Sequence, residues 1–196
     1  MRKIKNFKIT IKNREVSRML RKLLNVEELS IEQEEAVQRA CFFYNKTINP
    51  AVVYDTFSKE AGIFSFNIEE PAKWIACSPY IITIGNKLQE EFNKKQDMFG
   101  EHTIRIVSAI SANTLEQSKN FVQKILGDDA QKEYCELSRN IEIPNNLYSE
   151  ICKTLPIDKI NVSLINSEDN KTFKFEPSNT ITGLYYWIPV KRRTKK

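Results

Sequence analysis

Residues of the types that usually carry out catalysis are few in this chain and scattered along it. The single histidine, His102, lies at the start of a long helical pattern, so it could serve a triad only as the base, and a metal site with several histidines is excluded. The four cysteines form no CxxC pair, and we expect Cys41, Cys77, Cys135 and Cys152 to be free thiols in the core. No carboxylate cluster has the spacing of metal ligands. The residues alone therefore predict no self-contained catalytic or metal site.

Nucleotide-binding loops of the common kinds are also absent. The chain has only five glycines, with neither a GxGxxG motif nor a phosphate loop ending in GK[ST]. The aromatic run Tyr185, Tyr186 and Trp187 ends a β pattern, where it could stack on a flat ligand. It could equally consist of alternating core and rim residues on a terminal strand, and the sequence leaves both interpretations open.

Charge is distributed unevenly along the chain. Residues 1–22 hold nine Lys or Arg and one acid, residues 191–196 hold five basic residues, and the segment between them holds 24 acidic and 16 basic residues. Basic ends of this kind could attract an acidic partner or a phosphate-bearing ligand, or could simply be a solvated helix face and a frayed tail. Nucleic-acid binding is not expected, because the excess of basic residues is confined to the ends of the chain, whereas nucleic-acid-binding proteins usually carry a basic stripe across a folded face.

A helical hairpin is predicted at the amino terminus. After a short extended start, apolar residues recur at helical spacing from Val16 to Leu24, with Asn13 as the expected cap. Ser30 and Gln33 then have the spacing of a capping box in front of a second amphipathic helix.

The middle of the chain mixes strand and helix patterns. Strands are predicted in AVVYDTF (51–57), GIFSFNI (62–68) and PYIITIG (79–85), because they are rich in β-branched and aromatic residues. A surface helix is predicted in NKLQEEFNKK (86–95). A long central helix follows over residues 101–126, and Gly127 is its expected C-cap.

The last third is predicted to hold a polar connection, one short helix and three consecutive strands. The helix is PNNLYSEICKTLP (144–156), which Pro156 ends. The strands are INVSLIN (160–166), KTFKF (171–175) and NTITGLYYWI (179–188), joined by short polar turns such as SEDN.

These elements together predict a fold of the α+β class. Helices and strands alternate without regular βαβ units, which favours a mainly antiparallel sheet. At 41% apolar residues, residues 1–196 are expected to form a single domain, with 191–196 as a disordered basic tail. No apolar run is long enough to span a membrane, and charge is scattered through the first ten residues, so a cytoplasmic location away from membranes is expected.

Two stretches resemble the activation domain of cobalamin-dependent methionine synthase and its free-standing relatives. Residues 83–85 match that family's Thr-Ile-Gly turn at the end of a strand, and the next helix has the paired acids Glu90 and Glu91. In the long helix that follows, Ala109 and Glu116 match the family pattern, while Ser108 stands where the family usually has Asp.

The second stretch is FEPSNTITGLYY near the carboxyl terminus. It is similar to a family segment with a proline, a hydroxyl-rich strand start, a glycine and a tyrosine. The residues that fit this segment are Pro177, Thr180, Thr182, Gly183 and Tyr185. The helical hairpin and the helix over 144–156 also occur in the expected order, so the resemblance covers most of the chain.

The resemblance implies a specific function. Activation domains of this family bind S-adenosylmethionine and present it to a corrinoid held by a partner, so that oxidised cobalamin can be reductively remethylated. A corrinoid-binding protein or methyltransferase is therefore the expected partner, and any enzymatic role is methyltransferase-associated. The methyl donor needs an acid near its amine, for which Glu116 is the candidate, and Tyr185 is the candidate for a wall of the site.

One departure from the family keeps a second hypothesis open. The family has a glycine-rich loop with an arginine after the long helix, but this chain has YCELSRNIEIPNN there, and Arg139 is out of register. No glycine occurs between Gly127 and Gly183, so the backbone cannot approach a ligand in the same way. The alternative is a non-catalytic interaction subunit of a corrinoid methyltransferase system that has lost the S-adenosylmethionine site.

Overall fold

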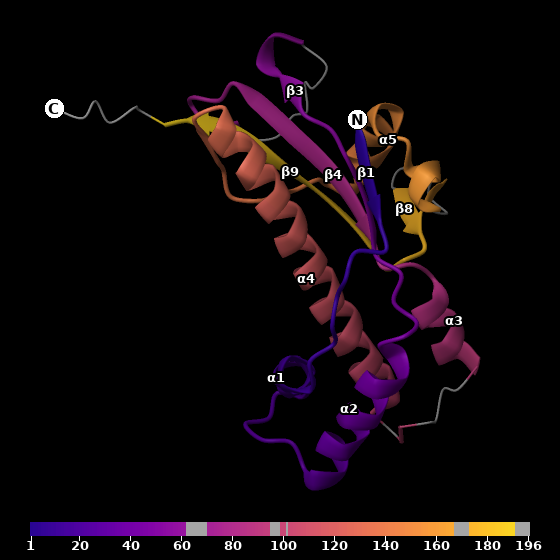
Figure 1. Cartoon of the computed structure of the whole chain (residues 1–196). Coiled ribbons are helices and arrows are strands. Elements are labelled where there is room, and N and C mark those ends of the chain that lie inside the picture. The colour runs from indigo at the N-terminus through magenta and orange to yellow at the C-terminus, as the bar shows by residue number, and fades with distance from the viewer. Residues whose placement is uncertain (62–69, 95–98, 101, 167–172, 191–196) are drawn as a thin grey trace, which may run out of the picture.

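Two long neighbouring strands form the centre of the structure, a computed structural model (Figure 1). The residues that it describes are 1–61, 70–94, 99–100, 102–166 and 173–190. Strands β4 (Ala76–Thr83) and β9 (Thr180–Pro189) pair antiparallel from Ala76 opposite Trp187 to Thr83 opposite Thr180. Their β-branched and aromatic side chains are almost all buried, as expected for central strands of a sheet covered on both faces.

Shorter strands complete the sheet on either side. Within the described residues, seven antiparallel strands form it in the order β1-β2-β4-β9-β5, with β3 also pairing with β4 and β6 with β9. The flanking strands are β1 (Arg2–Lys5), β2 (Ala51–Tyr54), β3 (Phe57–Ser58), β5 (Cys135–Leu137) and β6 (Ile141–Glu142). A separate hairpin consists of β7 (Ser163–Asn166) and β8 (Phe173–Glu176).

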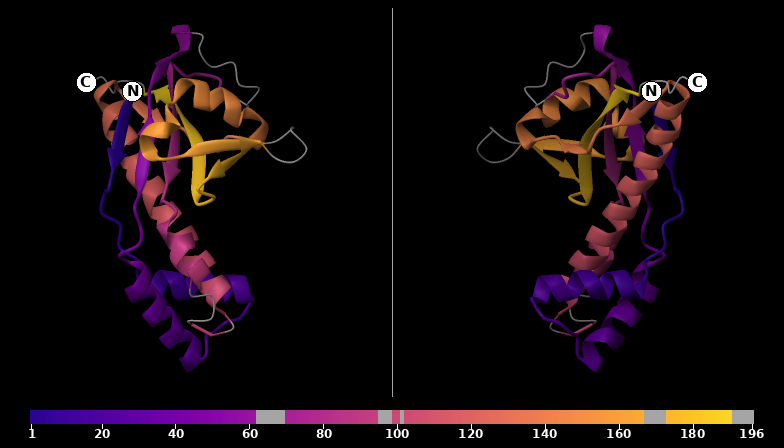
Figure 2. Two further views of the ribbon diagram at one scale, coloured as in Figure 1. Left: turned by 90° about the vertical axis from the view of Figure 1, so that its right-hand side faces the viewer. Right: turned by 90° about the vertical axis from the view of Figure 1, so that its left-hand side faces the viewer.

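The helices lie on both faces of the sheet and beyond one end of it (Figures 1 and 2). The α-helices are α1 (Asn13–Leu24), α2 (Ile31–Tyr44), α3 (Lys87–Lys94), α4 (Thr103–Lys132) and α5 (Tyr148–Thr154), and the short 3-10 helices are Lys59–Ala61, Asn145–Leu147 and Ile157–Ile160. Helix α4 crosses one face of the sheet and extends past its end, where α1 and α2 pack on it. The opposite face is covered by α5 and the β7–β8 hairpin.

Each face of the sheet has its own apolar core. Tyr80 and Tyr185 pack with Val122 and Leu126 of α4 on one face. On the other face, Leu184 and its neighbours pack against the α5 side of the molecule. Alternate residues of β9 therefore belong to different cores, as the period of two in a strand requires. The α+β class, the antiparallel sheet and the long central helix are confirmed.

The helix predictions hold with two corrections. The capping box at α2 is confirmed: Ser30 Oγ accepts from Gln33 N at 3.2 Å, and Ser30 N donates to Gln33 Oε1 at 2.9 Å. The predicted cap of α1 is wrong, because Asn13 is already helical and Lys12 occupies the cap position without a side-chain hydrogen bond. The predicted end of α4 is also wrong, since the helix continues through Gly127 to Lys132.

Strand predictions hold for most of the described chain. The predicted strand over 62–68, the SEDN turn and the 191–196 tail lie outside the described residues. Strands β5 and β6 occupy a segment that was predicted to be only a polar connection. None of the described helices is both long and apolar enough to cross a membrane.

Candidate ligand-binding cleft on the central helix

A cleft of about 770 Å³ opens between the middle of α4 and the strand pair β6–β9. We call it the α4 cleft. Its helical wall includes Glu116 and Lys119, and its other side includes Asn140 and Glu142. Tyr80 of β4 also lines it. The cleft thus combines an acid that the sequence singled out with polar groups from three other segments.

Gly183 leaves room for two residues that line this cleft, Tyr80 and Asn140. It lies opposite Tyr80 in the β4–β9 ladder. A Cβ atom at position 183 would lie 2.5 Å from Tyr80 Oη and 2.7 Å from Asn140 Oδ1. Because atoms cannot approach so closely, only glycine lets the tyrosine ring and the asparagine amide lie over β9 at this point.

Asn140 is held in place by the two strands that precede and follow it in the sequence, β5 and β6. It lies in the connection between β5 and β6, which both pair with β9. Two residues earlier, Ser138 N donates to Tyr186 O at 2.8 Å, and Ser138 Oγ accepts from Tyr186 N at 3.0 Å. The connection is therefore fastened to β9, and the Asn140 side chain is directed by backbone pairing on both sides.

Tyr80 fixes the orientation of the Asn140 amide. The phenol donates from Oη to Asn140 Oδ1 at 2.6 Å. Burial raises the pKa of the Tyr80 phenol far above its usual value, and the nearby Tyr185 and Glu142 act in the same direction. The phenol therefore keeps its proton and remains a donor. Because it takes the amide oxygen, it leaves the NH₂ group of Asn140 as the donor for a ligand.

Charges of both signs lie on the helical wall of the cleft. Glu116 and Lys119 are three residues apart on α4, so their side chains project from the same face of the helix. Glu142 adds a second carboxylate on the other side. An acid and an amine at this spacing can pair with the ammonium and carboxylate ends of a zwitterion, such as the amino-acid part of a larger ligand.

Tyr185, the second residue singled out from the sequence, lies one layer behind the cleft. Its side chain is only 1% exposed, and its ring stacks on that of Tyr80 with centroids 5.7 Å apart. Burial raises the pKa of the Tyr185 phenol. Glu116 and Tyr185 thus lie on the same face of the sheet, and Tyr80 contacts Tyr185 while lining the cleft with Glu116.

The rest of the aromatic run is buried as well. Tyr186 packs in the core on the opposite face of the sheet, against Trp74 with ring centroids 4.9 Å apart. Trp187 Nε1 donates to Ser78 Oγ at 2.9 Å. These rings are therefore core residues in this structure, packed against other side chains.

Several residues of the cleft were not singled out from the sequence, among them Tyr80, Lys119 and Asn140. Tyr80 lies within a run predicted as a strand, Lys119 belongs to the central helix, and Asn140 lies in the connection. The signal that could have found them is Gly183, because a glycine in the interior of a strand often marks a close approach of another group. Arg139, next to Asn140, is exposed. No group of three metal-ligating side chains occurs among the described residues.

Comparison with known proteins gives a fold relationship without a sequence relationship. No protein-family model and no curated protein matches the sequence. The chain is similar in fold to the MetH reactivation domain. The solved structure of that domain bound to AdoHcy has a TM-score of 0.61 and 12% sequence identity, over 97% of this chain and 79% of the other. The likeness supports the predicted relationship at the level of the fold, which is all that such low identity shows.

Proposed function

We propose that the chain is a stand-alone relative of the methionine synthase activation domain, and that its α4 cleft binds S-adenosylmethionine. In this role it supports the reductive remethylation of cobalamin held by a partner corrinoid protein or methyltransferase. The observation that carries the proposal is the placement of Glu116, Lys119 and the oriented Asn140 amide in one cleft. The similar MetH structure is bound to AdoHcy, which supports a ligand of this class.

The chemistry of the cleft fits such a ligand. Glu116 can accept from the ammonium of the amino-acid end, while Lys119 and the Asn140 NH₂ group can donate to its carboxylate. Apolar side chains for a flat base are provided by Leu115, Ile143 and Ile181, which also line the cleft. When bound, S-adenosylmethionine supplies an electrophilic methyl group on a sulfonium.

The chain's own residues would bind and orient the methyl donor. Tyr80 holds the Asn140 amide, and Tyr185 supports Tyr80 from behind. We propose that Tyr185 contributes to the wall indirectly in this way, with Glu116 as the direct partner of the ligand amine. Strands β5 and β6 lie in the segment where the sequence lacks the family's glycine-rich loop. We propose that the Asn140 side-chain amide contacts the ligand here in place of backbone groups.

Isothermal titration calorimetry with S-adenosylmethionine, and separately with cobalamin, tests the proposal. Saturable binding of S-adenosylmethionine is expected, and Glu116→Gln is expected to weaken it about 3- to 10-fold, since the side chain is exposed and its charge is screened. The matched control is Glu133→Gln, the same substitution at an exposed residue just beyond α4. The absence of saturable binding for both ligands would refute the proposal.

The second candidate function is a non-catalytic subunit that docks a corrinoid methyltransferase. One observation favours it. The segment in which the family has its glycine-rich loop holds two strands in this chain, β5 and β6, and both pair with β9. Affinity capture of a corrinoid protein, together with silence in the titrations, supports this candidate. Methyl transfer from S-adenosylmethionine to the corrinoid in the presence of a reductant would exclude it.

A further inference from the structure

The charges of the α4 cleft exceed by one carboxylate what an amino-acid zwitterion needs. Two acids and one base line the cleft, Glu116, Glu142 and Lys119, so it has one excess negative charge. Within the described part of the chain, none of the three takes part in an ion pair or a side-chain hydrogen bond. Because Glu116 and Lys119 suffice for the ammonium and carboxylate of a zwitterion, Glu142 is available for a further positive charge.

Glu142 is placed on the cleft by the alternation of side chains along β6. It lies opposite Gly183 in the pairing with β9. Ile141 packs in the core on the α5 side of the sheet, whereas its two neighbours Asn140 and Glu142 line the cleft. Residues two apart in an extended segment are separated by about 6–7 Å. A ligand whose carboxylate meets Asn140 can therefore place a group a few bonds further along its chain beside Glu142.

Two aromatic side chains that line the cleft lie near the Glu142 carboxylate. Burial raises the pKa of the Tyr80 and Tyr148 phenols, and the charge of Glu142 adds to both shifts. Tyr148 is only partly buried, and its ring is held by stacking on Phe175 with centroids 4.4 Å apart. A carboxylate beside an aromatic ring is a favourable environment for a weakly hydrated cation such as a sulfonium.

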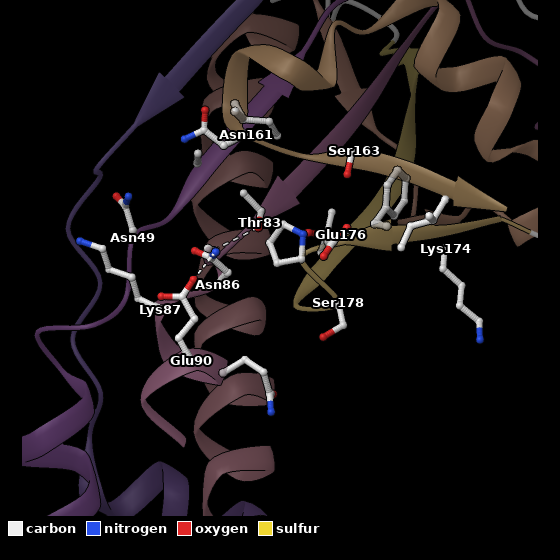
Figure 3. A pocket seen from close by; sticks show the side chains of 18 of the residues that line it. Asn49, Thr83, Asn86, Lys87, Glu90, Asn161, Ser163, Lys174, Glu176 and Ser178 are labelled. Atoms are coloured by element: carbon white, nitrogen blue, oxygen red, sulfur yellow. Dashed lines mark hydrogen bonds between the residues drawn. The ribbon is translucent and has the colours of Figure 1, made fainter. Parts of the chain in front are cut away.

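A second and larger cleft has the opposite balance of charge (Figure 3). It lies where β4 turns into α3, its volume is about 1000 Å³, and we call it the α3 cleft. Three bases and two acids line it, namely Lys5, Lys87, Lys174, Glu90 and Glu176. A ligand with a net positive charge is therefore expected in the smaller α4 cleft. Glu176, at the edge of the α3 cleft, provides a matched control for Glu142.

We infer that Glu142 makes the α4 cleft selective for the cationic methyl donor over its neutral product. This inference rests on the proposed function, because it names the residue that faces the sulfonium of S-adenosylmethionine. Loss of the methyl group to the corrinoid leaves the electron pair of the C–S bond on sulfur, which becomes a neutral thioether. The product, S-adenosylhomocysteine, keeps the contacts of its amino-acid end but loses the attraction of Glu142, so it is held less tightly than the donor.

Isothermal titration calorimetry with three ligands that share both ends tests the inference. S-adenosylmethionine has a sulfonium at its centre, S-adenosylhomocysteine has a neutral thioether, and sinefungin has a protonated amine on carbon. The unmodified protein is expected to bind the two cations about 3- to 10-fold more tightly than the thioether, a modest factor because Glu142 is exposed and its charge is screened. Sinefungin separates the effect of the charge from that of the methyl group.

One variant and one control assign the preference to Glu142. Glu142→Gln is expected to weaken both cationic ligands about 3- to 10-fold and to leave S-adenosylhomocysteine unchanged. A purely structural role of Glu142 would weaken all three ligands alike. Glu176→Gln is the same substitution at an exposed residue that, like Glu142, ends a short strand, and it is expected to change none of the three affinities.

Several results overturn the inference while the proposed function stands. These are equal binding of the three ligands by the unmodified protein, binding of sinefungin as weak as that of the thioether, and a preference that survives in Glu142→Gln. Equal weakening of all three ligands by Glu142→Gln, or an equal effect of Glu176→Gln, also overturns it. If none of the three ligands binds saturably, the proposed function and the inference are both refuted.

Discussion

Replacement of Gly183 by alanine should disturb the α4 cleft and the stability of the sheet together. The added Cβ would lie 2.5 Å from Tyr80 Oη, 2.7 Å from Tyr80 Cζ and 2.7 Å from Asn140 Oδ1. The tyrosine ring has little room to withdraw, since Tyr80 is fully buried and stacks on Tyr185. We therefore expect the ring to shift and its hydrogen bond to Asn140 to be lost.

The expected cost of Gly183→Ala is a net loss of about 1–3 kcal/mol of stability. Overpacking of a filled core costs about 1–3 kcal/mol, and loss of a hydrogen bond costs about 1 kcal/mol. Alanine also lowers the conformational entropy of the unfolded chain, which stabilises the folded state by about 0.4–1 kcal/mol and offsets part of this cost. Gly127→Ala is the matched control, because the nearest atom outside α4 is Leu137 Cδ1 at 3.9 Å. That variant is expected to be more stable by about 0.5–1 kcal/mol.

Urea unfolding followed by circular dichroism measures both variants. A double-mutant cycle with Tyr80→Phe tests the cause, because removal of Oη takes away the closest contact. In that background the cost of Gly183→Ala should fall by roughly 1 kcal/mol. The reasoning is refuted if Gly183→Ala is as stable as the unmodified protein, or if its cost is the same in both backgrounds.

Two further predictions concern the N-terminal cap of α2 and the buried thiols. Ser30→Ala removes one half of the capping box of α2 and should cost about 0.5–2 kcal/mol in urea unfolding; an unchanged midpoint would contradict this. Burial raises the pKa of the Cys41 and Cys77 thiols from 9.0 to about 12. Between these values the unfolded chain loses protons that the folded chain keeps, so the free energy of unfolding should fall as the pH rises above about 9. A free energy that rises between pH 9 and 11 would contradict that assignment.

Local patterns predicted most of the helices because their signals are short-range. The capping box at Ser30 and the apolar spacing of α1 depend only on residues a few positions apart. Gly127 shows where such signals fail. Its low helix propensity, about 1 kcal/mol less favourable than alanine, is overcome because Leu126 and Ala130 on either side of it are buried against the sheet.

Tertiary pairing is what the sequence could not reveal. Strands β5 and β6 are only three and two residues long and are recognisable through their partner β9. Similarly, the three predicted C-terminal strands do not form one meander, because β7 and β8 pair apart from the main sheet.

The candidate site was predictable only in part, because local patterns do not show long-range contacts. Glu116 was singled out from a family pattern, and it does line a cleft. Asn140 could not be found, because its importance depends on a hydrogen bond to Tyr80, sixty residues away in the chain. A polar residue in a connection gives no sign in sequence of the side chain that orients it.

A crystal structure of the chain with S-adenosylhomocysteine tests the central claim most directly. The account predicts ligand density in the α4 cleft, with the amino group near Glu116 and the carboxylate near Lys119 and the Asn140 amide. Density for the ligand at another place, or a cleft without ligand at saturating concentration, would contradict it.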